Sequence, residues 1–258
     1  MTFPLAACAE MLWRDKPLDW RCARLTDMGF GVGLWNWPHL DLAKIVSTKA
    51  RISIMNGFLR GGLTDDAGAA ELLATARETA VVGKRLGVER LNLLGAALGD
   101  GGIPIRANDH VTGPMWLKAR DTLARVVDLA DELDVTCTLE NLNLTVDHPG
   151  VPLARAADVL ALVSHINHPR LRMNLDLYHA QIGEGNLIAL CRTALPWIGE
   201  IQVADVPGRM EPGTGEVNWN GVAKGLKSMG YVGPITFEGY ASGEPEAALA
   251  AFRSAFSV

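Results

Sequence analysis

The sequence VTCTLEN at positions 135–141 is followed by LARAADVLALVSH at 153–165 and by LRMNLD at 171–176. The first and third segments are short and largely apolar on both faces, as parallel strands covered on both sides are. The segment between them spaces its apolar residues with the period of an α-helix. This stretch predicts a strand, a helix and a second parallel strand, with an acidic side chain, Glu140 or Asp176, at or next to the end of each strand.

The same alternation of strand-like and helix-like segments runs through the whole chain. Strands are predicted at 3–10, 29–35, 50–56, 88–95, 135–141, 171–176, 199–205 and 233–240, and helices at 17–28, 40–48, 66–86, 114–133, 153–165, 186–195, 219–229 and 244–256. An open, doubly wound sheet is the alternative, but no glycine-rich phosphate loop follows the first strand. Eight uninterrupted repeats favour a closed α/β structure, a (β/α)8 TIM barrel, with 1–258 as a single domain.

The composition argues against some classes of partner and location. The chain has 258 residues and a net charge of -5 with both signs dispersed, which argues against a nucleic-acid partner. No apolar run reaches the roughly 18 residues that a membrane crossing needs, and the N-terminus lacks the pattern of a signal peptide. The four cysteines are far apart in sequence, so we expect reduced core residues and a cytoplasmic protein.

Side chains that can bind a metal ion stand at or near the ends of the last four predicted strands. They are Glu140 on the fifth, Asp176 on the sixth, Gln202 and Asp205 on the seventh and Glu238 on the eighth. Polar residues at strand ends are often only solvated, but acidic groups gathered without a cation would repel one another. Glu140, Asp176, Glu238 and the amide oxygen of Gln202 predict a hard oxygen site for Mg²⁺ or Mn²⁺.

Other residues are expected at the same face of the barrel, where the active sites of such barrels lie. His179 follows Asp176 closely, and Arg209 lies in a loop constrained by Gly and Pro. Each has a structural alternative, as a packing group or a surface charge. We predict that both contact substrate, with Arg209 as a clamp for a carboxylate. Trp35 is either packing at the barrel mouth or the apolar wall of a pocket.

The C-terminal half resembles the hydroxypyruvate isomerase family, within the larger xylose-isomerase-like barrel superfamily. The most specific stretch is IQVADVPGRMEPGTGEVN at 201–218, and LENLN at 139–143, DLYH at 176–179 and FEGY at 237–240 are similar to other motifs of the family. The resemblance is clear over about 135–240. It departs at the second strand, where GLW at 33–35 stands in place of a Glu, and in a shorter loop at 57–64.

The resemblance implies roles for individual residues. Glu140, Asp176, Gln202 and Glu238 would bind the divalent ion, Glu140 and Glu238 would also be the acid/base pair, and His179 and Arg209 would contact the substrate. The implied reaction is the isomerisation of a small hydroxy-carbonyl acid, such as hydroxypyruvate to tartronate semialdehyde, through an enediolate and without an organic cofactor. The expected partner is that small molecule, and association into a homo-oligomer stays open.

Several rival functions share these residues. A ketose 3-epimerase or a 2-oxo-tetronate-type isomerase would use the same atoms, although related epimerases usually carry His where this chain has Gln202. A non-catalytic sugar-acid binding protein would not require two opposed carboxylates. A metal-dependent nuclease would need a basic face and more than the six histidines present.

Overall fold

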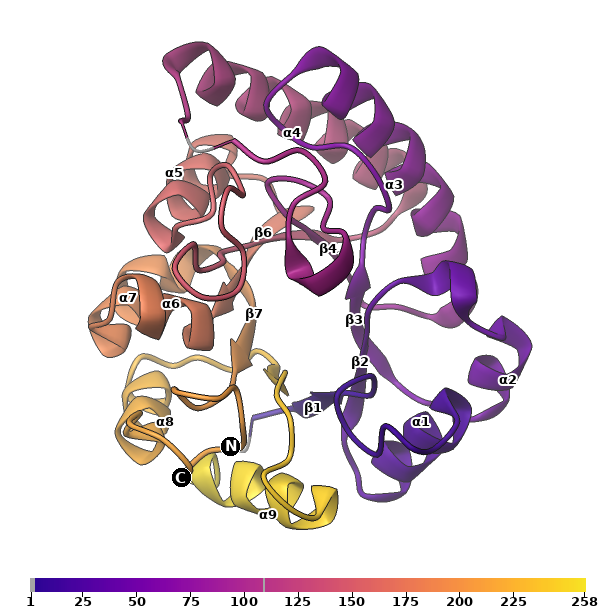
Figure 1. Ribbon diagram of the computed structural model, residues 1–258, viewed down its shortest axis with the longest axis vertical. Helices are drawn as coiled ribbons and strands as arrows, with labels where there is room; N and C mark the ends of the chain where they lie inside the picture. Colours follow the sequence, from indigo (N-terminus) through magenta and orange to yellow (C-terminus); the bar gives the residue numbers. More distant parts are fainter. Residues whose placement is uncertain (1–2, 109) are drawn as a thin grey trace.

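The computed structural model describes residues 3–108 and 110–258 and confirms the barrel. Eight parallel strands close in chain order, each hydrogen-bonded to the next and β8 to β1. Figure 1 shows them at the centre with the helices around them. Their bounds are β1 (Leu5–Cys8), β2 (Gly31–Leu34), β3 (Ile52–Asn56), β4 (Arg90–Leu93), β5 (Cys137–Glu140), β6 (Leu171–Asp176), β7 (Ile198–Val203) and β8 (Ile235–Phe237).

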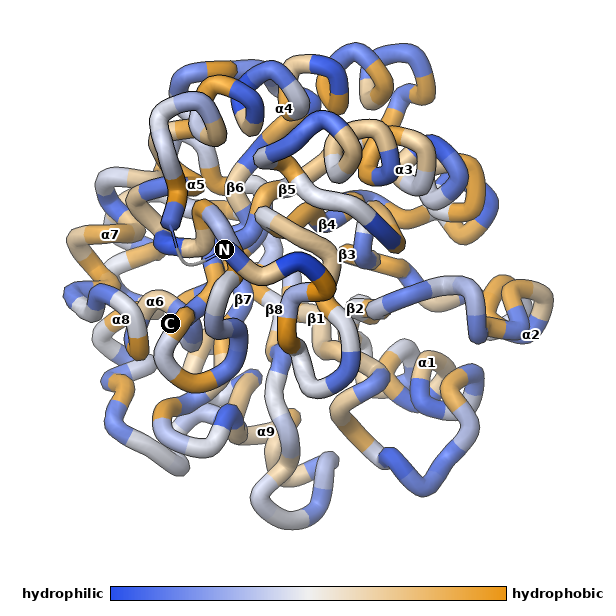
Figure 2. Tube along the Cα trace, turned by 45° about the horizontal axis from the view of Figure 1, so that its top comes forward, coloured by the Kyte–Doolittle hydropathy of each residue, from blue (hydrophilic) through white to orange (hydrophobic). Residues whose placement is uncertain are grey.

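The helices fill the segments between the strands. They are α1 (Leu18–Asp27), α2 (Leu42–Ser47), α3 (Asp66–Leu86), α4 (Gly113–Leu133), α5 (Ala156–Ile166), α6 (Leu177–Gly183), α7 (Leu187–Ala194), α8 (Trp219–Ser228) and α9 (Pro245–Ala255). Three short 3-10 helices are η1 (Trp37–His39), η2 (Asp100–Gly102) and η3 (Leu195–Trp197). Along the outer helices, hydrophilic and hydrophobic residues alternate (Figure 2), as expected for helices that pack one face on a barrel. No described helix combines the length and the apolarity that a membrane crossing requires.

Local signals explain where the helices begin and end. Asp65 accepts a hydrogen bond from the backbone N–H of Gly68 at the start of α3, and Gly87 ends that helix with a φ of 67°. The start of one helix was predicted wrongly, and one helix was not predicted. The helix expected from 153 begins at Ala156, because Leu153 has a left-handed φ of 55°. The sequence also missed α6, which begins immediately after β6 because Asp176 caps its backbone.

The core between barrel and helices is apolar, but the inside of the barrel is not. Glu200 on β7 is fully buried there and pairs with Arg90 on β4 at 3.3 Å. Ser53 donates to the same carboxylate at 3.4 Å, and the hydroxyl of Thr236 also donates to it. Burial raises the pKa of Glu200 to about 7 even though the Arg90 charge lowers it. A polar layer therefore crosses the barrel beneath the C-terminal ends of the strands.

The register of the last strands places the candidate ligands side by side. Glu140 on β5 is aligned with Asn174 on β6, and Asp176 on β6 is aligned with Gln202 on β7. Because the strands are parallel and in register at their C-terminal ends, these side chains share one end of the barrel. The four cysteines are buried, as the sequence predicted.

Candidate functional site

A cavity of about 550 Å³ opens at the C-terminal end of the barrel. Its volume lies within the range of small-molecule sites. Four of the predicted site residues line it, namely Glu140, His179, Arg209 and Glu238. The wall also includes Trp35, Asn56, the loop from Leu98 to Gly102, Asp147, His148 and Tyr240. Asn56, at the end of β3, donates a hydrogen bond to Asn36 at 3.3 Å.

Glu140, Asp176 and His179 form a compact group of potential metal-binding side chains, with one atom of each within 4.8 Å of the others. All three are buried. Nε2 of His179 lies 3.9 Å from Oε1 of Glu140 and 3.8 Å from Oδ2 of Asp176. The same Asp176 accepts the backbone N–H of His179 on its Oδ1 at 2.9 Å. The turn from β6 into α6 thus fixes His179 beside the two carboxylates.

The charges of this group favour a cation. Burial, and then the charges of Glu238 and Asp176, raise the pKa of Glu140 well above its ordinary value. Burial also raises the pKa of Asp176 to about 7, although the nearby Arg209 lowers it. Buried carboxyl groups such as Glu140 and Asp176, which lie close together in this group, are donors that a hard divalent cation stabilises. The residues present therefore fit a Mg²⁺- or Mn²⁺-like ion.

Gln202 does not line the main cavity. It is buried and lines, together with Glu238, a small neighbouring hollow that shares Trp35 and Asn56 with the main cavity. Its Oε1 accepts a hydrogen bond from Nδ2 of Asn174 at 2.7 Å. An amide oxygen has a second lone pair, so that contact leaves one for an ion. Asn174 also donates to Oδ1 of Asn92 at 3.2 Å, and the side-chain amide of Asn92 donates to Glu140.

Glu238 connects the barrel mouth to the loop after β7. Its Oε2 pairs with Nη2 of Arg209 at 3.1 Å, and its backbone carbonyl accepts from Nε of Arg209 at 3.2 Å. The guanidinium also lies over the ring of Tyr178, 5.0 Å from its centroid. Burial would lower the pKa of Arg209, but the charges of Glu238, Asp176 and Glu140 outweigh it and raise that pKa. Arg209 is thus a permanent cation already paired with one candidate ligand.

Asp205, the other acidic residue at the end of the seventh predicted strand, organises the loop instead of facing the ligands. Its carboxylate accepts backbone N–H groups of Val206, Gly213 and Val217 at 2.9, 2.8 and 3.1 Å. The carboxylate therefore ties both ends of the loop that carries Arg209. Glu216, at the end of this loop, accepts a hydrogen bond from Gln181 at 3.1 Å.

The structure adds site residues that the sequence did not single out. Glu10 follows β1, and its Oε1 accepts the backbone N–H of Trp35 at 2.7 Å. Burial raises the pKa of Glu10 to about 7, and Glu238 adds to the rise. Asn143 contacts Nδ1 of His179 at 2.8 Å, and the ring of His148 packs against His179 with 5.1 Å between centroids. Glu10 ends a predicted strand in the same way as the chosen carboxylates, so that signal could have found it.

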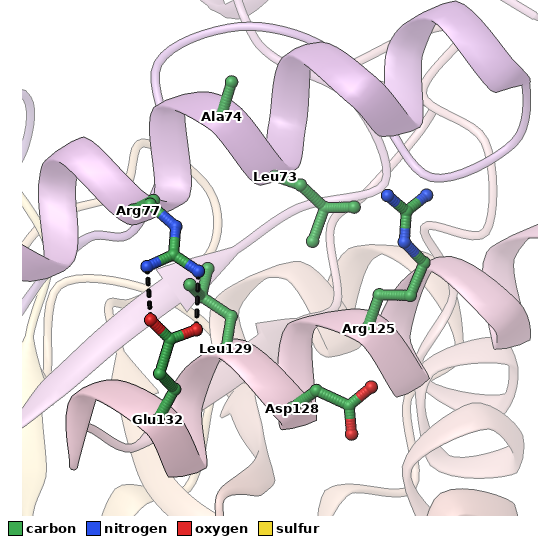
Figure 3. Close-up of a pocket in the computed structure, with 7 residues that line it drawn as sticks. All are labelled: Leu73, Ala74, Arg77, Arg125, Asp128, Leu129 and Glu132. Carbon is green, nitrogen blue, oxygen red and sulfur yellow. Dashed lines mark hydrogen bonds and ion pairs between the residues drawn. The ribbon is translucent and has the colours of Figure 1, made fainter.

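A second hollow lies outside the barrel between α3 and α4 (Figure 3). Arg77 on α3 and Glu132 on α4 face one another there and form a bidentate ion pair at 2.6 Å. This hollow is built from helix surface residues that reach across to each other. It lacks the buried carboxylates of the barrel mouth, so the candidate active site is the cavity at the strand ends.

Comparison with known proteins agrees with this fold. The family model described as "Xylose isomerase-like TIM barrel" matches residues 41–255. A solved structure titled as an AP endonuclease, family 2, from Brucella melitensis superposes with a TM-score of 0.84 at 22% identity, covering 98% of this chain and 99% of that one. D-psicose 3-epimerase from Clostridium cellulolyticum H10 superposes with a TM-score of 0.80 at 16% identity, covering all of both chains. Because their sequence identities to this chain are low, these two structures support the fold alone.

The names of the sequence relatives match the family that the C-terminal half resembles. The 2-oxo-tetronate isomerase of Pectobacterium atrosepticum is 26% identical over 93% of each chain. The hydroxypyruvate isomerase of Escherichia coli is 33% identical over 41% of this chain and 40% of the relative. These relatives are named isomerases, and the present chain is an isomerase that belongs to the xylose isomerase-like TIM barrel family.

Proposed function

We propose that this protein is a divalent-metal-dependent isomerase of small hydroxy-carbonyl acids, of the hydroxypyruvate and tartronate semialdehyde type, and that it works through an enediolate. The observation that carries the proposal is the meeting of Glu140 and Glu238 at one cavity beside the buried pair Asp176 and His179. The names of the sequence relatives support the class of substrate.

Glu140, Asp176, Gln202 and Glu238 would hold the ion. Their oxygens suit Mg²⁺ or Mn²⁺, and no organic cofactor is needed. When bound, the ion supplies Lewis-acid polarisation of the substrate carbonyl and offsets the negative charge that develops on oxygen. The buried carboxylates of Glu140 and Asp176 also give the ion a low-dielectric setting, where electrostatic stabilisation is stronger than in water.

The two glutamates would move the protons. One removes the proton from the hydroxyl-bearing carbon, and the other returns a proton to the neighbouring carbon. A general acid or base works best when its pKa is near the working pH. Burial raises the pKa of Glu140, which is the direction that a carboxyl working near neutral pH requires. Glu238 is oriented for its task by Arg209 and by the indole of Trp35, which donates to it at 2.9 Å.

Arg209 would recognise the substrate carboxylate. Two of its donors, Nε and Nη2, are used by Glu238, and the side chain still lines the cavity. A guanidinium has five N–H groups, so donors remain for a second carboxylate. An anionic substrate would therefore meet a cation that already touches one of the two proposed acid/base residues.

A 2-oxo-tetronate is the second candidate substrate. The cavity of about 550 Å³ exceeds what a three-carbon acid fills, and the glycine-rich loop from Leu98 to Gly102 forms part of its wall. A four-carbon chain could extend toward that loop while its carboxylate stays near Arg209. The chemistry at the carbonyl would be the same, so the two candidates differ only in the length of the pocket they occupy.

A substrate panel tests the proposal. The chelator-treated protein is mixed with hydroxypyruvate, 2-oxo-tetronate, D-psicose or a neutral C3 hydroxy-ketone, with and without Mg²⁺, and products are followed by NMR. We expect isomerised product from one of the two acids and only with the ion present. Product from psicose alone would mean a ketose epimerase. Binding of acids without turnover would mean a sugar-acid binding protein, and cleavage of an abasic DNA duplex, tested in parallel, would mean a nuclease.

A further inference from the structure

The amide of Asn143 has only one orientation that fits its surroundings. Asn143 is buried in the loop after β5, and its Oδ1 accepts the backbone N–H groups of Val146 and Asp147 at 2.9 and 3.0 Å. A backbone N–H can only donate, so the atom that faces these two groups is the oxygen. The other amide atom, Nδ2, must then be the nitrogen that lies 2.6 Å from Oδ2 of Asp147 and 2.8 Å from Nδ1 of His179.

This orientation determines which nitrogen of His179 carries hydrogen. An amide NH₂ group only donates, so Nδ1 of His179 must accept with its lone pair. The carboxylate of Asp147 is 3.9 Å from the same Nδ1, too far to draw a proton there by a hydrogen bond. An imidazolium would carry a hydrogen on Nδ1 as well, so a ring whose Nδ1 accepts from Asn143 is neutral. A neutral imidazole has one N–H, which leaves it on Nε2.

Nε2 of His179 points at the candidate site. It is buried and has no hydrogen-bond partner among the described residues. Its neighbours are the carboxylate oxygens of Glu140 and Asp176 at 3.9 and 3.8 Å. A buried donor without a partner is costly unless a ligand supplies an acceptor. Nitrogen that carries hydrogen in the ring plane has no lone pair to give to a metal ion.

We propose that Asn143 is a positioning residue that holds His179 as its Nε2–H tautomer, so that His179 donates a hydrogen bond to a substrate oxygen and does not ligate the ion. The role in substrate binding rests on the proposed function above, whereas the tautomer does not. A preorganised neutral donor at a carbonyl stabilises the negative charge that develops on its oxygen. His179 is then a hydrogen-bond donor beside the proposed ligands Glu140 and Asp176, although the three side chains form one compact group.

Nitrogen NMR of the wild-type, ion-free protein tests the tautomer directly. Protein labelled with ¹⁵N-histidine at neutral pH should show Nε2 of His179 as the protonated, pyrrole-like nitrogen and Nδ1 as the pyridine-like one. A spectrum of His179→Gln identifies the resonances among the six histidines. The pattern should persist on adding Mg²⁺. An Nδ1–H tautomer, an imidazolium, or a metal-induced change at Nε2 typical of ligation would overturn the proposal. This readout does not depend on any turnover, so it can succeed where the proposed function fails.

A paired exchange of side chains tests the positioning role. In N143D/D147N the donor and acceptor trade places, so the residue at 143 accepts from His179 and the tautomer should switch to Nδ1–H. The matched control is Asp147→Asn alone, which leaves the amide of Asn143 donating and should keep Nε2–H. If the proposed function holds, kcat of the double variant should fall about 10²-fold below that of the control, the scale of losing one oxyanion donor. Equal ¹⁵N spectra for the two variants would contradict the role of Asn143.

Discussion

Trp35, just after β2, donates its indole N–H to Oε1 of Glu238 at 2.9 Å, while Oε2 of the same carboxylate pairs with Arg209 at 3.1 Å. Both oxygens of Glu238 are therefore held, one from the β2 side and one from the loop after β7. The backbone N–H of Trp35 is itself tied to Glu10 at 2.7 Å. The proton transfer proposed for Glu238 requires a narrow range of positions, and these donors supply that restraint.

Trp35→Phe should reduce turnover while the ring still fills the wall of the cavity. A hydrogen bond to a charged group contributes about 1.5–3 kcal/mol, which corresponds to a loss of roughly 10- to 150-fold in kcat/KM. The control is Trp37→Phe, because the indole of Trp37 donates to Thr79 on α3 at 2.9 Å and not to the site. Steady-state kinetics of the two variants check this. Equal activities would mean that Trp35 only packs.

Arg209→Ala should impair acids more than neutral substrates, but it should impair both. The sequence alone suggested only a clamp for the substrate carboxylate. The contact of Arg209 with Glu238 at 3.1 Å adds a loss of kcat that every substrate shares. Arg209→Lys should restore part of the charge without the paired N–H groups. Measuring kcat and KM for hydroxypyruvate and for a neutral hydroxy-ketone separates the two effects, and an unchanged kcat for the neutral substrate would refute the coupling to Glu238.

Ion binding should strengthen as pH rises. Burial raises the pKa of Asp176 to about 7 and that of Glu140 well above its ordinary value in the ion-free protein. A raised carboxyl pKa means that the folded state binds extra protons, so the stability of the ion-free protein falls as pH rises from about 4.5 through 7. An ion bound as proposed would replace those protons. Thermal unfolding with Mn²⁺ or with chelator should therefore show a larger ion-induced rise in Tm at pH 8 than at pH 5.5.

Two further measurements test whether ion binding strengthens as pH rises. Asp176→Asn should lower the ion-induced rise in Tm at pH 8, since one negative ligand is lost. Equal ion-induced rises at pH 5.5 and pH 8 in the wild-type protein would show that ion binding does not compete with protons on these carboxyls.

Arg90→Met should destabilise the barrel, and more so at high pH. It leaves the buried Glu200 without its cation, and breaking such a pair costs about 3–5 kcal/mol. Because the pKa of Glu200 is about 7, the carboxyl is protonated at pH 5 and the lost attraction is small there. At pH 8 the variant must bind a proton that the unfolded chain does not hold. Urea unfolding at both values checks this, and a loss that is larger at pH 5 would contradict it.

The strands were predictable because a parallel barrel leaves a strong signal. Each strand is buried on both faces, so its run of apolar residues stands out between amphipathic helices. The same regularity put Glu140, Asp176, Gln202 and Glu238 at one end of the barrel, since parallel strands share the direction of their C-terminal ends. Their assignment as metal ligands and acid/base groups remains a proposal.

The remaining features of the site could not be predicted, because they depend on contacts between segments that are distant in the sequence. Asn143 and His179 are 36 positions apart and meet at 2.8 Å only after β5 and β6 pair. Trp35 and Glu238 are 203 positions apart, and their contact requires the barrel to close. The hydrophobic periodicity within one segment does not indicate such contacts. Helix α6 was missed for another reason, because Asp176 is both the last residue of β6 and the cap of the next helix.

Deuterium exchange with Glu140→Gln and Glu238→Gln tests the two-glutamate proposal most directly. Each variant is saturated with Mg²⁺ and incubated with the best substrate in D₂O. The matched control is Glu132→Gln on α4, where the side chain faces Arg77 on α3 outside the barrel (Figure 3). Wild type and control should form isomerised product labelled next to the carbonyl. Each site variant should lose about 10²- to 10⁴-fold in turnover, and at most one should still exchange the substrate's carbon-bound proton. If either ion-loaded variant kept more than about a tenth of wild-type turnover, the two-glutamate mechanism would be wrong.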